Sequence, residues 1–113
     1  MVVEELVVEV SAADRAAFLA RDREVWTAFL VGCPGFVRKE VWLPADRDDG
    51  VVIQIWWTSR AAWKAIDADV VAQIDARMGT MRRPVMCREH EVVEPAALRG
   101  SASIDERRGR AAR

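Results

Sequence analysis

Two titratable residues of this chain stand where acid–base chemistry could use them. Asp22 lies between Phe18 and the pair Val25–Trp26 on the apolar stripe of an expected helix, so its carboxylate is expected to face the core. A buried carboxylate needs a partner or acquires a raised pKa, and such groups are candidate general bases. The alternative, which the pattern favours, is a surface aspartate at the edge of the stripe that pairs with Arg15 or Arg21.

His90 is the second candidate and the single histidine of the chain. Alternation along an expected strand places it on one face with Met86, Arg88 and Val92. An imidazole titrates near neutrality and could move protons for substrate or O2 chemistry. The alternative is a strand residue whose ring bonds a neighbour or water, and this is the commoner role. Asp22 and His90 are therefore the predicted catalytic residues, should the protein be an enzyme.

Tryptophan is abundant, whereas tyrosine is absent. The five tryptophans are Trp26, Trp42, Trp56, Trp57 and Trp63. Each can serve as core bulk, because a buried aromatic side chain removes roughly 150–250 Å² from water. Alternatively, two or three of them line an apolar cleft for a planar ligand. We predict that Trp26, Trp57 and Trp63 are the substrate-binding residues, with core packing as the alternative for each.

Metal and cofactor chemistry finds little support in the sequence. One histidine and two widely separated cysteines, Cys33 and Cys87, supply no ligand spacing of the zinc kind. The acidic cluster around Asp48 lacks the downstream glutamate of a calcium loop, and the six glycines form no phosphate-binding loop. The sequence therefore predicts no metal and no cofactor.

Composition limits the function classes further. A chain of 113 residues with 51% hydrophobic and 31% charged residues fits one globular domain. A net charge of −1 argues against an electrostatic nucleic-acid binder, and no apolar run reaches the ~20 residues of a membrane helix. The acidic N-terminus and two cysteines are typical of a cytoplasmic protein. We expect no nucleic-acid and no membrane partner.

The C-terminal segment differs from the rest. Residues 96–113 carry a net charge of +3 and few large apolar side chains, whereas residues 1–95 carry −4. Such a segment buries too little surface to offset the entropy of ordering. We predict a domain over residues 1–95 and a basic, disordered tail over residues 96–113.

Apolar periodicity predicts six elements within the domain. Strands are expected over Val2–Val10, Phe36–Leu43, Val51–Thr58 and Val85–Val93, and helices over residues 11–31 and 59–78. Ser11 and Ser59 are predicted N-caps, and Asp67 with Asp69 is expected to break the second helix. The order β-α-β-β-α-β predicts an α+β, ferredoxin-like fold, in which a four-stranded antiparallel sheet carries both helices on one face.

The third expected strand is apolar on both faces. Ile53 and Trp57 alternate with Val52 and Trp56, although a sheet covered on one side should expose polar residues on the other. A second copy is the economical cover for this patch. We therefore predict a homodimer packed sheet to sheet, with Val52 and Trp56 in the interface.

Several motifs, taken in order, resemble the antibiotic biosynthesis monooxygenase-like superfamily. They are Asp22–Thr27, Pro34–Phe36, Lys39–Trp42 and Trp57–Trp63, and the resemblance covers roughly residues 2–93. It is strongest to a group of short, uncharacterised bacterial proteins in that superfamily. It implies a dimeric α+β barrel with a cleft between helices and sheet. The haem-degrading members carry a histidine on the second helix, where this chain offers Ile74, Asp75 and Arg77, and the cofactor-free oxygenases use an asparagine, which is absent here.

Two functions therefore remain open. The favoured one is a homodimeric module that binds a small apolar molecule in the cleft. The alternative is a cofactor-independent monooxygenase acting on a small aromatic or polyketide-like substrate, with Asp22 or His90 abstracting a proton before the substrate reacts with O2. Missing asparagine and missing helix histidine favour the binding module.

Overall fold

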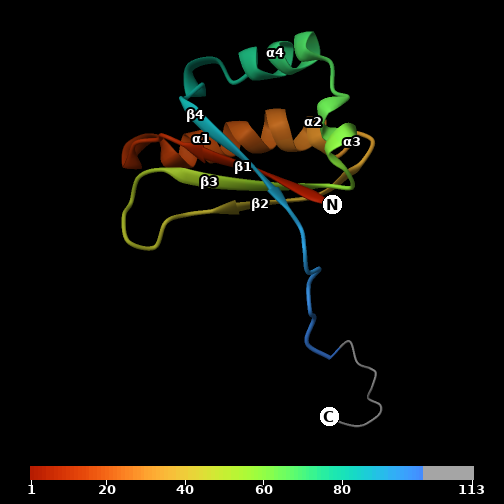
Figure 1. The fold of residues 1–113 in the computed structure, drawn as a ribbon. Coiled ribbons are helices and arrows are strands. Elements are labelled where there is room, and N and C mark those ends of the chain that lie inside the picture. Colours follow the sequence, from red (N-terminus) through yellow and green to blue (C-terminus); the bar gives the residue numbers. More distant parts are fainter. Residues whose placement is uncertain (101–113) are drawn as a thin grey trace.

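A computed structural model describes residues 1–100 of the chain. Along the sequence it contains β1 (Val2–Val8), η1 (Ala12–Asp14), α1 (Arg15–Asp22), η2 (Arg23–Thr27), α2 (Ala28–Leu30), β2 (Phe36–Trp42), β3 (Val51–Trp57), α3 (Arg60–Lys64), α4 (Ala68–Ala76), η3 (Gly79–Met81) and β4 (Val85–Glu91). Figure 1 shows the helices together on one side of the sheet. The predicted ferredoxin-like βαββαβ fold is confirmed.

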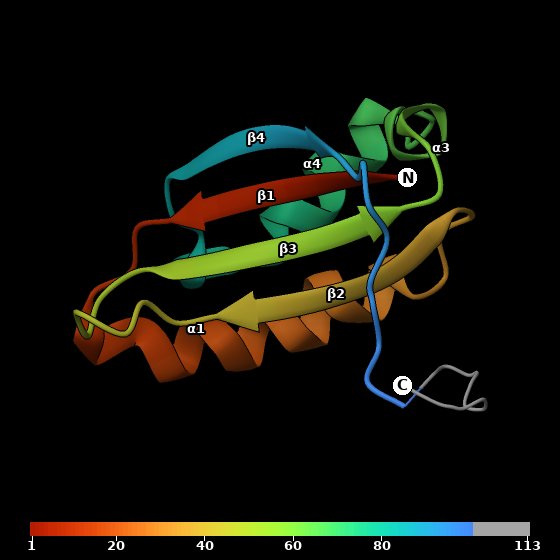
Figure 2. The ribbon, with the colours of Figure 1, turned by 60° about the horizontal axis from the view of Figure 1, so that its bottom comes forward.

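The four strands form one antiparallel sheet in the order β2-β3-β1-β4. The central strand β1 pairs with β3 through Leu6 and Ile53, and with β4 through Leu6 and Cys87. Viewed from below in Figure 2, the second sheet face carries no helix among the described residues. Register along each strand therefore decides which side chains enter the covered layer and which remain on the open face.

The first helical region is continuous from residue 12 to residue 30 but changes its winding. Ser11 caps its start, as predicted, because its hydroxyl accepts a hydrogen bond from the Asp14 amide at 3.3 Å. η2 is a π-helical turn, and the amide of Ala28 bonds the carbonyl of Arg23 five residues earlier. One extra residue is thus accommodated in the middle of this helix.

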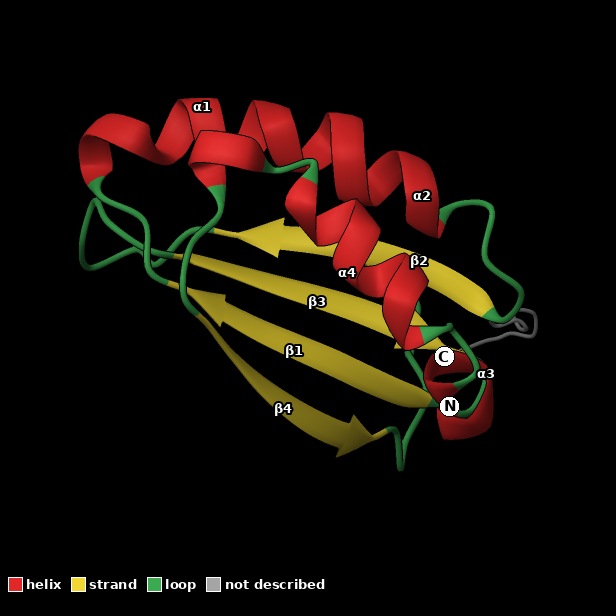
Figure 3. Ribbon diagram, turned by 90° about the horizontal axis from the view of Figure 1, so that it is seen from above, coloured by secondary structure: helices red, strands yellow, loops and turns green. Residues whose placement is uncertain are grey.

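The second helical region is split where the sequence predicts it. Ser59 caps α3 by accepting from the Ala62 amide, and Asp67 caps α4 by accepting from the Asp69 and Val70 amides. A new cap inside the region starts a second helix at a new angle. Figure 3 shows α3 and α4 as separate segments beside the long first helix.

The core lies between the helices and the sheet. Trp57, Val8 and Val51 are its most deeply buried side chains, and Trp57 has no exposed surface. Phe18 and Leu30 reach into the same layer from the first helical region. Among residues 1–100, no helix is long and apolar enough to cross a membrane.

β2 contains a bulge between Phe36 and Arg38. Phe36 pairs with Trp57 and Lys39 pairs with Ile55, so three residues of β2 match two of β3. Phe36 and Lys39 are three positions apart and would otherwise lie on opposite faces of the sheet. The bulge lets both side chains face the helices.

The tail predicted over residues 96–113 is only partly within the described chain. Residues 96–100 form no helix or strand, and in Figure 1 the chain after β4 runs away from the helices. The rest of the expected tail, residues 101–113, lies outside the described residues. Its predicted disorder remains a prediction.

Gly35 connects the first helical region to β2 where the backbone touches α3. Its φ is +84°, and a Cβ built there would overlap Ala62 Cβ. The loop is held because the Thr58 amide donates to the Gly35 carbonyl at 2.8 Å. Both the backbone angle and the close approach therefore require glycine at this position.

We expect Gly35→Ala to lower the free energy of unfolding by about 2–4 kcal/mol, because it combines left-handed strain with overpacking. Gly79→Ala is the matched control, since Gly79 also has positive φ (+57°) but a Cβ there meets nothing within 4 Å. The control should lose only about 1–2 kcal/mol. Urea denaturation followed by tryptophan fluorescence measures both, and equal losses would contradict the predicted steric contribution.

Candidate functional site

A large cavity lies between the helical layer and the sheet. Its volume is about 1060 Å³. Residues from β1, β2, β3, β4 and all four α-helical segments line it, including Leu6, Val8, Phe18, Leu30, Ile53, Ile55, Ile66, Val71 and Met78. Its walls are thus mainly aliphatic and aromatic. A space of this size and character matches the pockets in which proteins bind small molecules.

The three tryptophans predicted to bind substrate all line this cavity. Trp57 comes from β3 and is fully buried, Trp63 comes from α3, and Trp26 comes from η2. Trp26 is half-buried and meets Phe29 edge to face, with ring centroids 6.1 Å apart. The remaining two tryptophans, Trp42 and Trp56, lie on β2 and β3 outside the cavity.

Asp22 lines the same cavity and is 3% exposed. The surface position favoured from the sequence is wrong, and so are its expected partners. Arg15 instead donates to the backbone carbonyls of Asp49 and Gly50, while Asp22 accepts from Lys39 Nζ at 2.6 Å. Both side chains of this ion pair are 5% exposed. Sequence periodicity identified the buried face of the helix, but not the lysine on β2 that makes burial tolerable.

Lys39 has a second partner one helical turn further along. Its ammonium donates to Thr27 Oγ1 at 2.7 Å. In a regular α-helix, residues five apart point in directions about 140° apart. The wider turn of η2 brings Asp22 and Thr27 to the same side of the helix, where both can reach Lys39. The π-helical turn is therefore what assembles this polar cluster.

Glu4 is a cavity residue that the sequence analysis missed. It is half-buried on β1, and Trp57 Nε1 donates to its Oε1 at 3.2 Å. Burial raises the pKa of the Glu4 carboxyl above its usual 4.5, although the Trp57 hydrogen bond and the Lys64 charge act in the opposite direction. Its only sequence signal is its alternation with Leu6 and Val8, which places it on the covered face.

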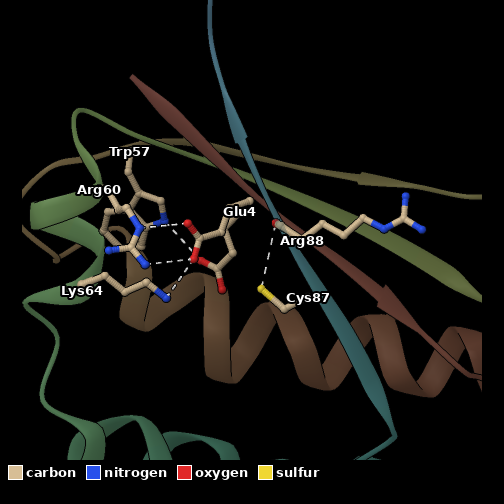
Figure 4. A network of polar contacts seen from close by, with 7 residues as sticks. Glu4, Trp57, Arg60, Lys64, Cys87 and Arg88 are labelled. Carbon is tan, nitrogen blue, oxygen red and sulfur yellow. Dashed lines mark hydrogen bonds and ion pairs between the residues drawn. The ribbon is translucent and has the colours of Figure 1, made fainter.

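The rim beside Glu4 is tied together by charges from α3 and β4. Arg60 Nε and Lys64 Nζ bind Glu89 at 2.9 and 3.3 Å. Lys64 also lies 4.0 Å from the centre of the Trp63 ring. Figure 4 shows Glu4 and Trp57 next to these α3 cations. The contacts fix the position of α3, and with it the Trp63 wall.

Glu4 and Lys39 belong to the same row across the sheet. Lys39 pairs with Ile55, and Ile55 pairs with Glu4, so one strand separates the two charged residues. Two inter-strand spacings correspond to about 10 Å. The cavity floor therefore has a basic group near one side, a carboxyl group near the other and an apolar side chain between them.

His90 lies on the open face of the sheet, away from the cavity. Its Nε2 is 3.1 Å from Glu5 Oε1, which also accepts from Gln54 Nε2 at 3.1 Å. The expected alternation with Met86 and Arg88 is correct, but strand pairing turns that face away from the helices. The structure therefore brings Asp22 to the three tryptophans of the cavity and leaves His90 apart.

Val52 and Trp56, the predicted interface residues, also occupy the open face. Val52 lies between Val7 and Trp42, and Trp56 lies between Val3 and Arg38 in the register of the sheet. The Arg38 guanidinium stacks over the Trp56 ring at 3.9 Å. Both residues are only partly buried within one chain.

Glu4 gives a pH signature to test. The folded chain holds its proton more tightly than the unfolded chain, so this group makes the free energy of unfolding fall as pH rises from about 4.5 through the raised pKa. Glu4→Gln removes that titration but keeps an acceptor for Trp57. We expect the stability of E4Q relative to wild type to increase with pH across this interval and then level off.

Urea unfolding at several pH values between 4 and 8 measures this difference. Glu9→Gln is the control, because Glu9 follows β1 directly and is exposed. A pH-independent difference between E4Q and wild type would contradict a raised pKa at Glu4.

This chain is similar to known proteins in its structure but not detectably in its sequence. No family model matches the sequence, and no curated protein sequence matches it either. Solved structures do match. The haem-degrading protein MhuD of Mycobacterium tuberculosis, solved with two haems in its active site, is 21% identical, with a TM-score of 0.70 over 86% of this chain and 100% of that chain.

Two further structures have similar scores. The monooxygenase ActVA-Orf6 of Streptomyces coelicolor, in complex with nanaomycin D, is 16% identical, with a TM-score of 0.70 over 86% of this chain and 90% of that one. A dimeric ferredoxin-like protein from an uncultured marine organism is 14% identical, with a TM-score of 0.67 over 87% and 100%. Other matches carry the name antibiotic biosynthesis monooxygenase.

The cavity does not fit a haem held by histidine. Among the described residues its lining includes no histidine or cysteine, and α4 contributes Ala68, Val71, Ala72 and Asp75. Within residues 1–100 there is also no group of three or more side chains suited to hold a metal ion. The resemblance seen in the sequence is confirmed at the level of architecture: this chain has the α+β fold of the antibiotic biosynthesis monooxygenase-like proteins.

Proposed function

We propose that this protein binds a small apolar molecule in the cavity between its helices and sheet, and that it does so as a homodimer. The observation that carries the proposal is a cavity of about 1060 Å³ with Trp26, Trp57 and Trp63 in its walls. Aromatic walls give a planar ligand large contact areas at little conformational cost. Two of the structures with this fold contain ligands, haem in one and nanaomycin D in the other.

The open face of the sheet supports the homodimer. One cross-strand row on it is entirely apolar: Trp42, Val52, Val7 and Met86 follow one another across the four strands. Trp42 and Met86 are 47% and 57% exposed in the single chain. A continuous apolar row of this kind is costly in water and is typical of an interface. One structure with this fold is described as a dimeric protein.

Polar residues on the same face of the sheet favour a specific dimer contact over non-specific association. The row next to the apolar one contains Glu40, Gln54, Glu5 and Arg88. Gln54 is 5% exposed, and its amide is held by Glu5. A second sheet laid on this face would therefore meet both an apolar row and fixed hydrogen-bonding groups, which set the register of the pair.

Val52→Lys tests the dimer. A lysine in the apolar row would be buried without a partner, so we expect a monomer or an aggregate in place of the dimer. Trp56→Glu should behave in the same way. Native mass spectrometry distinguishes the 12.7 kDa chain from twice that mass.

Val31→Lys is the control for this experiment, because Val31 is 65% exposed at the end of the first helical region, away from the sheet face. It should leave the mass unchanged. A V52K protein that remains a dimer with wild-type stability would exclude sheet-to-sheet packing.

Trp26→Ala tests the ligand cavity. Fluorene, a flat hydrocarbon, is the probe, and its binding is measured by equilibrium dialysis. Loss of one aromatic wall should weaken binding about tenfold. Val31→Ala is the control, since Val31 is 65% exposed and belongs neither to the cavity lining nor to the apolar row of the sheet. Equal binding of fluorene by both variants would refute the assignment of the cavity.

The second candidate function is a cofactor-independent monooxygenase for a small aromatic or polyketide-like substrate. The observation that favours it is Glu4, a carboxyl group with a raised pKa that lines the cavity. Asp22 is less suited to take a proton while Lys39 binds it at 2.6 Å, and His90 is outside the cavity. E4Q distinguishes the two functions. It would abolish O2 uptake if the protein is an oxygenase, whereas fluorene binding should be preserved in both cases.

A further inference from the structure

The cavity contains a buried lysine, Lys39, that binding of a purely apolar ligand would not require. Lys39 lines the cavity, whose lining is mainly aliphatic and aromatic, yet its own side chain is only 5% exposed. Burying a charge is expensive, and replacing a buried ion pair by apolar side chains of similar volume is often neutral or stabilising. A cation at this position is therefore not explained by packing alone.

The ammonium group has hydrogen-bonding capacity to spare. A lysine ammonium has three N–H donors. Within residues 1–100, Lys39 Nζ donates to two acceptors, Asp22 Oδ2 and Thr27 Oγ1. One donor is left at the wall of a cavity whose other lining is mostly apolar.

Two irregularities of the backbone converge on this group. The π-helical turn η2 brings Asp22 and Thr27 to one side of the helix, and the bulge in β2 lets both Phe36 and Lys39 face the helices. Each irregularity inserts one residue into a regular element, and both kinds occur preferentially next to functional sites. Together they bring the lysine ammonium within hydrogen-bonding distance of both Asp22 and Thr27.

We propose that Lys39 anchors the ligand by donating its third hydrogen bond to a neutral carbonyl oxygen at the edge of a planar aromatic molecule. Asp22 and Thr27 position the ammonium group, while Trp26 and Trp63 contact the flat faces of the ligand. The ligand class is thus an aromatic ketone rather than a plain hydrocarbon. This inference rests on the proposed binding function of the cavity.

The charges of the cavity favour a neutral acceptor over an anion. Asp22 already neutralises Lys39, and Glu4 lies in the same cross-strand row about 10 Å away. The other cations of the lining are paired as well: Lys64 with Glu89, Arg82 with Asp75 and Arg83 with Asp14. An anionic ligand would bring an uncompensated negative charge into this apolar space, at a large desolvation cost. A carbonyl oxygen accepts the hydrogen bond without adding charge.

Fluorenone and fluorene form the matched pair of probes, because they share one ring system and differ in the carbonyl oxygen. Equilibrium dialysis gives the ratio of their dissociation constants for the wild-type protein and for D22L/K39M, in which both charges are replaced by apolar side chains. The wild-type preference for fluorenone should fall about tenfold or more in the variant, as expected for a lost hydrogen bond from a charged donor. Differences in hydrophobicity between the probes cancel in this comparison.

R47M/D49L is the control. It makes the same replacements at an exposed ion pair outside the cavity lining, in which Arg47 Nε and Asp49 Oδ1 are 3.3 Å apart, and it should keep the preference. Unchanged preference in D22L/K39M, with both probes bound, would overturn the Lys39 anchor but leave the binding cavity intact. Failure of both probes to bind the wild type would overturn the cavity function and the anchor together.

An infrared measurement keeps the test independent of whether D22L/K39M folds. The carbonyl stretching band of fluorenone bound to the wild-type protein should lie at lower frequency than in an aprotic solvent, because a hydrogen bond weakens the C=O bond. A band at the aprotic frequency would overturn the proposal.

Discussion

The ion pair between Asp22 and Lys39 links the first helical region to the sheet, and the polar half of the cavity is built around it. Its two side chains are 5% exposed, so the pair exists in surroundings where either charge alone would be unstable. Removing one partner of such a pair typically costs about 3–5 kcal/mol. The pair consequently holds η2 at a fixed position over β2, and it sets where Trp26 stands in the cavity wall.

Regular elements by themselves would not form the cluster of Asp22, Thr27 and Lys39. Asp22 and Thr27 are five residues apart on a helix, and Phe36 and Lys39 are three apart on a strand; in each case regular geometry separates what the structure brings together. A π-helical turn and a β-bulge correct both separations by one residue each. The first helical region and β2, which flank the same cluster, are therefore both irregular at this point.

The two faces of the sheet have different consequences for function. The covered face forms a cavity with a mainly apolar lining, and Lys39 and Glu4 are charged residues that the sheet contributes to it. The open face carries an apolar row beside a polar one, and it holds His90, the residue that the sequence offered as a proton carrier. The proposed ligand cavity and the proposed dimer interface therefore lie on opposite faces of the sheet.

The sequence by itself determined the order of the elements, their caps and the alternation of each strand, because these depend on local spacing. It also identified the three cavity tryptophans, since large apolar residues at core positions surround any space left there. Only the tertiary structure decided that Lys39 is the partner of Asp22, that Glu4 enters the cavity and that His90 does not. Those outcomes depend on strand pairing and on single-residue register shifts, which bring together residues distant in sequence and leave no periodic signal.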